Sequence, residues 1–181
     1  LDLLNFRAEM LPEQYGMFMS TFGNINTYTV YVALVVAVSG TLFALSEEKT
    51  GRIGFYYLVY LVSTLALITG ASDNAYLSLA GLFGALPFAA FRSSKSRARY
   101  FLLLSTLILA ICYIAGVSVS MAGKVLPLYG LFRVLGGIRP LPYLGAVLGV
   151  VSLVLLYRER NQEITESAHA KRWIRGYTAV L

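Results

Sequence analysis

Long apolar runs, separated by short clusters of charged residues, dominate the pattern of the chain. A helix needs roughly 20 apolar residues to cross about 30 Å of hydrocarbon at a rise of 1.5 Å per residue. Five gaps between charged residues are close to that length. They predict membrane-spanning helices at residues 26–46, 53–72, 75–91, 100–122 and 140–157. The pattern therefore predicts an all-α fold, a polytopic transmembrane helical bundle of about five spans.

The segments that flank this bundle have a different expected role. Residues 1–25 are expected to form an extracytoplasmic or interfacial lead-in to the bundle at 26–157, and residues 158–181 a cytoplasmic connector to a further span. The chain begins with Leu rather than Met, and its apolar end at 176–181 follows a basic cluster, as a further span would. We therefore interpret the chain as the middle fragment of a larger bundle.

Composition excludes an ordinary water-soluble domain and a disordered chain. Of the 181 residues, 57% are hydrophobic and only 13% are charged, with a mean hydropathy of +0.68; both values lie far from those of soluble or disordered proteins. The net charge of +6 would suggest nucleic acid in a soluble protein. Here the basic residues flank apolar spans instead of forming one face, so membrane topology explains them better. We expect membrane lipid as a partner and no nucleic acid.

The distribution of basic residues predicts the orientation, because Lys and Arg in short loops stay on the cytoplasmic side. Eleven of the 15 basic residues fall on one face and four on the other. The larger set is Lys49, Arg52, Arg92, Lys95, Arg97, Arg99, Arg158, Arg160, Lys171, Arg172 and Arg175, and the smaller set is Arg7, Lys124, Arg133 and Arg139. We therefore place the larger set inside. The start of the chain, the turn near residue 73 and the loop near residue 130 are then extracytoplasmic.

Metal and thiol chemistry have little support in the sequence. Cys112 is the only cysteine and His169 the only histidine. A single cysteine forms no intrachain disulfide, and the two residues make no cluster of metal ligands. We expect no metal and no cofactor, and we interpret His169 as a solvated loop residue on the inner side.

Two glycines in the last predicted span favour close helix packing. Gly145 and Gly149 are four residues apart, so they lie on the same helix face. Small residues at this spacing let a neighbouring backbone approach. We expect that neighbour to be another helix of the same chain.

Polar residues meet at the predicted outer face in two places. Asn24 and Asn26 begin the first span, and Ser72 and Asp73 form the turn after the second. Consecutive antiparallel spans bring the start of one beside the end of the next, so these four residues are candidates for lining one pocket. Capping is the competing interpretation: Asn and Asp are favoured at the first turn of a helix, where the side-chain oxygen accepts a free backbone N–H, an effect of roughly 1 kcal/mol.

These segments also resemble a known family. Residues 21–26 read Thr-Phe-Gly-Asn-Ile-Asn, and a basic loop, an apolar span and a polar turn that begins at Ser72 follow them. This order resembles the O-antigen ligase and polymerase family of bacterial envelope enzymes. The chain has Ile25 where Pro is common in the family, and Asp73 and Asn74 replace the Arg and Gly of the family's Ser-Arg-Gly turn. The resemblance covers residues 21–99, under half of the chain.

The resemblance implies a multi-pass glycosyltransferase of the GT-C type in the bacterial cytoplasmic (inner) membrane. Such enzymes take a glycan from an undecaprenyl pyrophosphate carrier and join it to an acceptor at the outer face. Arg133 and Arg139 are then candidates for pyrophosphate contacts, since arginine binds phosphate oxygens bidentately. Asp73 would repel the pyrophosphate and cannot take that role. The catalytic residues remain unknown, and the resemblance places the catalytic loop beyond Leu181.

A non-catalytic membrane transporter or scaffold fragment is the alternative function. Transporters bind substrate near the midplane, often at broken helices with polar groups. The first, second, fourth and fifth predicted spans lack charge through their centres, and Asp73 sits at an edge. This pattern argues against an ion-coupled carrier but leaves a facilitator open.

Overall fold

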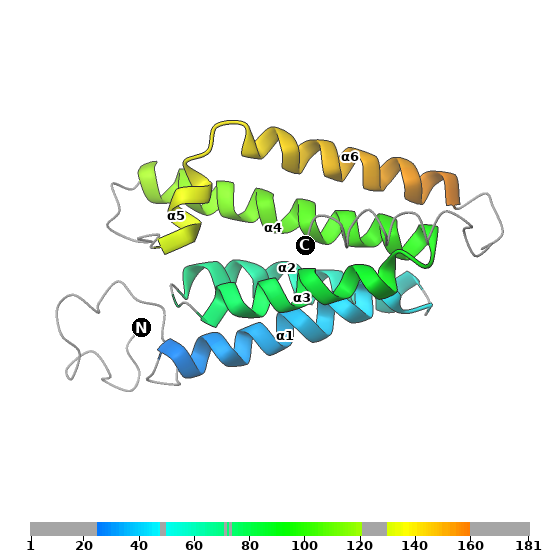
Figure 1. Cartoon of the computed structure of the whole chain (residues 1–181), viewed down its shortest axis with the longest axis horizontal. Coiled ribbons are helices and arrows are strands. Elements are labelled where there is room, and N and C mark those ends of the chain that lie inside the picture. The colour runs from blue at the N-terminus through cyan, green and yellow to red at the C-terminus, as the bar shows by residue number, and fades with distance from the viewer. Residues whose placement is uncertain (1–24, 48–49, 71, 73, 121–129, 160–181) are drawn as a thin grey trace.

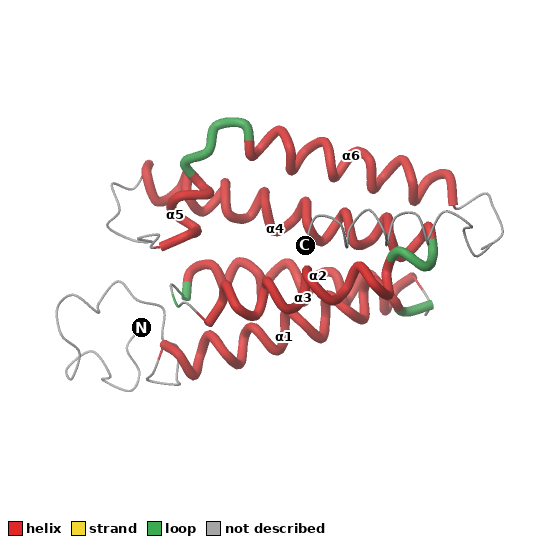
Figure 2. The backbone as a smooth tube through the Cα atoms, viewed as in Figure 1, coloured by secondary structure: helices red, strands yellow, loops and turns green. Residues whose placement is uncertain are grey.

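A computed structural model describes residues 25–47, 50–70, 72, 74–120 and 130–159. Within these ranges the chain is all-α, as predicted, and Figure 2 shows helices joined by short connections. Six helices are described, and most run along the long axis of the molecule (Figure 1). They are α1 (Ile25–Leu45), α2 (Thr50–Thr69), α3 (Asn74–Ala90), α4 (Ser94–Ser120), α5 (Gly130–Gly136) and α6 (Leu141–Glu159).

The predicted spans correspond to five of these helices. Four of them, α1, α2, α4 and α6, are long and apolar enough to cross a membrane. The third predicted span, α3, is a shorter apolar helix of 17 residues, which reaches only about 26 Å at 1.5 Å per residue. The protein is therefore a multi-pass membrane protein, and its described residues contain four long apolar helices and one shorter one.

The ends of the helices differ from the boundaries drawn at charged residues. The fourth helix begins at Ser94 instead of residue 100, and the last helix continues to Glu159 instead of residue 157. Lys and Arg are good helix formers, so a helix continues through them. Ser93 caps the start of α4, because its Oγ accepts a hydrogen bond from the Ser96 N–H at 3.3 Å. The charged residues therefore show roughly where the spans lie, but they do not mark where the helices begin and end.

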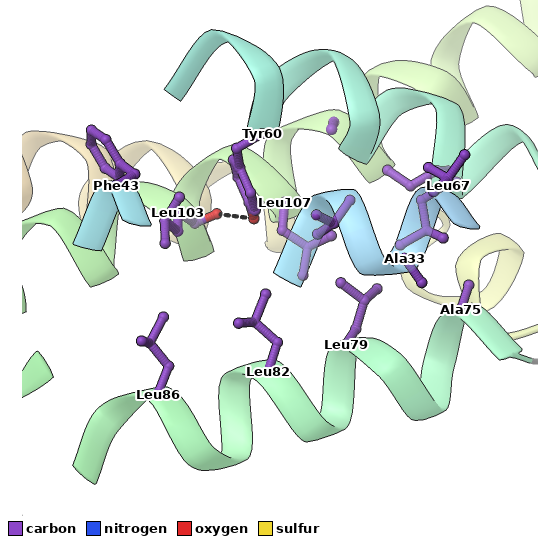
Figure 3. Close-up of a cluster of buried hydrophobic side chains, with 14 of the residues drawn as sticks. Ala33, Phe43, Tyr60, Leu67, Ala75, Leu79, Leu82, Leu86, Leu103 and Leu107 are labelled. Carbon is purple, nitrogen blue, oxygen red and sulfur yellow. Dashed lines mark hydrogen bonds between the residues drawn. The ribbon is translucent and has the colours of Figure 1, made fainter. Parts of the chain in front are cut away.

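Helix α4 occupies the centre of the bundle. It contacts α1, α2 and α3 on one side and α6 on the other, and Figure 1 shows α6 running beside α4, away from α1 and α3. The largest fully buried apolar side chains of α1, α2 and α4 are Tyr60, Leu67, Ile68, Leu103 and Val36, and Figure 3 shows the leucines of α3 facing this group. The apolar core therefore lies among α1 to α4.

Two tyrosines connect α2 to α4 through their hydroxyl groups. Tyr60, which is fully buried, donates to the Leu103 carbonyl at 3.0 Å (Figure 3). The Tyr57 hydroxyl lies 2.8 Å from Thr106 Oγ1. A polar group inside a membrane must find a partner within the protein, because lipid offers none. These bonds therefore fix how α2 lies on α4.

A third tyrosine compensates for the proline inside α3. Pro87 has no N–H, so the Phe83 carbonyl four residues earlier receives no helical hydrogen bond from it. The Tyr100 hydroxyl of α4 donates to this carbonyl at 3.4 Å. The Phe83 and Tyr100 rings also contact edge to face, with centroids 5.9 Å apart. Helix α4 thus satisfies a backbone group that Pro87 leaves open.

Helices α4 and α6 pack antiparallel through small residues, which confirms the interpretation of the two glycines. Ser105 Oγ donates to the Gly145 carbonyl, and Ser152 Oγ to the Ala98 carbonyl, each at 2.7 Å. A Cβ atom built on Gly149 would lie 2.9 Å from Ser105 Oγ. The backbones therefore approach too closely for larger residues on this face of α6.

The connections gather at the two ends of the bundle. The α1–α2 and α3–α4 connections and the last turn of α6 lie at one end, and the starts of α1, α3 and α6 lie at the other (Figure 1). The first end carries Arg52, Arg92 and Arg158, so by the positive-inside rule we predict that it is cytoplasmic.

Cysteine labelling tests this orientation. In a Cys112→Ala background, we expect Ser94→Cys and Thr165→Cys to be shielded from a membrane-impermeant thiol reagent added to intact cells. Asn74→Cys and Gly130→Cys should react, because they belong to the opposite end. Position 165 lies outside the described residues, so its variant tests the sequence prediction alone. Labelling in the reverse pattern would refute the orientation.

Candidate functional site

Two of the four predicted pocket residues meet at one end of the bundle. Asn26 is the second residue of α1, and Ser72 lies two residues before the start of α3. Ser72 Oγ donates a hydrogen bond to Asn26 Oδ1 at 2.9 Å, across 46 residues of sequence. Ser72 is buried, whereas Asn26 is exposed. The pair therefore has one side inside the protein and one side open to its surroundings.

A glycine at the end of α2 makes this meeting possible. A Cβ atom on Gly70 would lie 3.0 Å from Thr29 Oγ1 and 3.3 Å from the Leu67 carbonyl oxygen. In the same region the Tyr28 hydroxyl donates to the Ala66 carbonyl at 3.4 Å. The end of α2 therefore lies directly against the first turns of α1. Ser72, which follows α2 in the chain, is thereby placed next to Asn26.

A backbone hydrogen bond ties Ser72 to the start of α3. The Ala75 N–H donates to the Ser72 carbonyl at 3.0 Å, and inside α3 Ser78 Oγ donates to the Asn74 carbonyl at 2.8 Å. The Ser72 backbone is therefore tied to the start of α3, which leaves its hydroxyl directed to Asn26.

The other two predicted pocket residues, Asn24 and Asp73, lie outside the described residues. Their place in a pocket stays a prediction, and so does the binding role of the set. For Asn26 the structure shows a contact other than capping. Its side-chain oxygen accepts a hydrogen bond from Ser72, so Asn26 connects the first turn of α1 to the segment between α2 and α3.

The predicted pyrophosphate contacts come from a different part of the same end. Arg133 belongs to α5 and Arg139 to the α5–α6 connection, and both side chains are exposed. Helix α5 begins at Gly130, whose φ of 54° is one that glycine adopts easily. It packs on α3 through the Tyr76 and Phe132 rings, with centroids 4.8 Å apart. The structure therefore places these arginines outside the core and available to a ligand.

The opposite end contains buried arginines that the sequence reasoning missed. Arg97 and Arg99 belong to the basic cluster that we interpreted only as a topology signal, yet both are buried. Arg99 Nη1 donates to the Phe43 carbonyl at 3.2 Å and to the Ser46 carbonyl at 2.6 Å. Its guanidinium also lies 5.7 Å from the centre of the Phe43 ring. Arg99 therefore caps the last turn of α1, where a positive charge is favourable.

The only hint in the sequence that Arg99 is buried is its position next to the apolar run of α4. Arg99 directly precedes the apolar run of α4, so it lies within a buried helix turn instead of a loop. No local pattern reveals which carbonyls it contacts, because Phe43 is 56 residues away.

The chemistry of the Asn26–Ser72 pair is that of neutral hydrogen bonding. A carboxamide provides two donors and an acceptor, and a hydroxyl provides both, so the pair suits the hydroxyl groups of a sugar better than it suits proton transfer. Among the described residues, no group of three or more His, Cys, Asp or Glu lies close enough to hold a metal ion. No protein family, curated protein or solved structure matches the chain.

Proposed function

We propose that this chain forms the membrane scaffold of a bacterial glycan transferase of the O-antigen ligase or polymerase type. It would transfer or polymerise a glycan from an undecaprenyl pyrophosphate carrier at the outer face of the cytoplasmic membrane. The observation that supports this proposal most is the hydrogen bond between Ser72 and Asn26. It joins the two segments that carry the resemblance to the family, although they are far apart in sequence.

The surroundings of the pair are compatible with a lipid-linked substrate. The pair lies at an end of a bundle of membrane helices, the level at which the headgroup of a lipid carrier would lie. Arg133 and Arg139 are exposed, and α5, which carries Arg133, lies at the same end as the start of α1 (Figure 1). In this proposal the arginines hold the pyrophosphate, and Asn24, Asn26 and Ser72 position hydroxyl groups of the glycan or acceptor. Asp73 orients an acceptor hydroxyl or a partner arginine.

The substitution Asp73→Asn tests this function. It removes the charge of the side chain at nearly constant shape and keeps a good helix cap. We expect glycan transfer to fall about tenfold, equivalent to about 1.4 kcal/mol of barrier, with unchanged protein in the membrane. The measurement is glycan transfer in a deletion strain complemented with the full-length protein, normalised to membrane abundance. Equal transfer would show that Asp73 only caps a helix.

A second pair of variants tests the observed hydrogen bond. Ser72→Ala removes the bond to Asn26, whereas Ser78→Ala removes only a bond within α3. We expect transfer to fall in the first variant and to stay near normal in the second. If the deletion strain transfers glycan as well without the protein as with it, and the reconstituted protein instead takes up a labelled solute, the transporter function replaces this proposal.

A further inference from the structure

Basic side chains of the α3–α4 connection, the start of α4 and the end of α6, at the end of the bundle opposite Asn26, fall into two groups with different surroundings. Arg97 and Arg99 are buried and engage the protein, Arg97 through Ser94 Oγ at 3.1 Å and Arg99 through the end of α1. Arg92 and Arg158 are exposed, and Lys95 is half-buried. We call Arg92, Lys95 and Arg158 the basic collar.

The collar residues come from elements that the structure places together. The hydrogen bond from Ser152 to the Ala98 carbonyl sets the antiparallel register of α6 on α4. The last turn of α6 therefore lies beside the first turn of α4, and Glu159 attracts the Arg97 guanidinium electrostatically. Figure 1 shows the end of α6 and the α3–α4 turn at the same end of the bundle.

The acidic residues described at this end attract the buried arginines electrostatically. Glu159 acts on Arg97, and Glu47 on Arg99. The buried arginines thus balance these carboxylates, and Arg92 and Arg158 of the collar add positive charge on exposed side chains.

An apolar surface continues directly from the collar along α6. Only Gly145 and Ser152 are buried on this helix. Large apolar side chains are exposed along the rest of it, among them Val147, Val150, Leu153, Val154 and Tyr157. Because α6 is long and apolar enough to span a membrane, acyl chains are the natural neighbours of this face. Tyr157 and Arg158 are adjacent in the chain, so the apolar face ends where the collar begins.

We propose that the collar binds the headgroup of an anionic phospholipid whose acyl chains lie on the exposed face of α6. The phosphate of such a lipid complements the collar's positive charge, and basic residues near a membrane surface attract anionic lipid. A soluble anion would use the collar alone, whereas a lipid uses both the collar and the adjoining apolar face. This site is independent of glycan transfer, because it lies at the opposite end from Asn26 and Ser72.

Native mass spectrometry of the full chain tests the proposal. The protein in detergent is given equal amounts of phosphatidylglycerol and phosphatidylcholine, and the retained lipids are counted. We expect wild type to retain phosphatidylglycerol preferentially. The double variant Arg92→Gln/Arg158→Gln should retain about tenfold less of it, with phosphatidylcholine unchanged.

Two further double variants separate this site from general charge and from misfolding. Arg133→Gln/Arg139→Gln removes two exposed charges at the opposite end and should keep phosphatidylglycerol binding. Arg92→Lys/Arg158→Lys keeps the charge and should keep most of the binding. The proposal is overturned if wild type retains both lipids equally, or if both glutamine variants lose the same amount. Displacement of phosphatidylglycerol by millimolar inorganic phosphate would show a site for a free anion instead.

Discussion

Arg99→Met should lower the free energy of unfolding by about 2–3 kcal/mol, because hydrogen bonds from a charged group contribute about that much. The Arg99 guanidinium donates to the carbonyls of Phe43, in the last turn of α1, and of Ser46, directly after that helix. Methionine keeps an apolar stem of similar length but has no donor. The last turn of α1 then loses its connection to α4, and the two carbonyls lose a partner inside the protein.

Arg92→Met is the matched control for this prediction. Arg92 belongs to the same basic cluster but is exposed, so the same change should alter stability by no more than about 0.5 kcal/mol. The measurement is thermal or denaturant unfolding of both variants in the same detergent. Arg99→Lys, which keeps the charge but not the fork of donors, should lie between wild type and Arg99→Met. Equal stability of the two methionine variants would contradict the capping role of Arg99.

Gly145→Leu should destabilise the packing of α6 on α4 by about 1–3 kcal/mol, the range observed when side chains are forced into filled cores. Even a Cβ atom at Gly145 would lie 2.9 Å from Ile108 Cγ2 and 3.0 Å from Leu109 Cδ2. The Gly145 carbonyl also accepts the hydrogen bond from Ser105 at 2.7 Å. A leucine therefore pushes the helices apart and weakens that bond as well.

The neighbouring position offers the control. Ala146 is exposed on α6, so Ala146→Leu adds apolar volume to the outer face without meeting α4. We expect its unfolding midpoint in detergent to remain near that of wild type, while the midpoint of Gly145→Leu falls. A similar fall in both variants would mean that leucine disturbs α6 itself and not its contact with α4.

The sequence by itself determined the helical type and the approximate location of the apolar helices that the structure describes. An apolar run of about 20 residues is long enough to cross the membrane as a helix, and a helix satisfies its own backbone hydrogen bonds inside lipid. This constraint is local, so the spans could be found without knowing their neighbours. The close approach at Gly145 and Gly149 was predictable for the same reason, because four-residue spacing places both glycines on one helix face.

Only the tertiary structure decided what the polar side chains contact. Sequence reasoning treated Arg92, Arg97 and Arg99 as one topology signal, yet Arg92 is exposed and the other two are buried. The difference depends on where the end of α1 and the last turn of α6 lie relative to α4, which no neighbouring residue encodes. The start of α4 also departed from the charge-based boundary, since the helix continues through Arg97 and Arg99, whose buried side chains bind groups of the protein.

The candidate site shows the same division. The order of the spans brought Asn26 and Ser72 to the same end of the bundle, because consecutive antiparallel helices share their ends. The 2.9 Å hydrogen bond between them depended on the packing of the helices as well as on their order. It required Gly70 to let α2 lie against α1 and the turn at Ser72 to direct the hydroxyl toward Asn26. Hydrophobic length acts along the chain and can be read from it, whereas hydrogen bonds between helices depend on packing geometry that forms only when the bundle assembles.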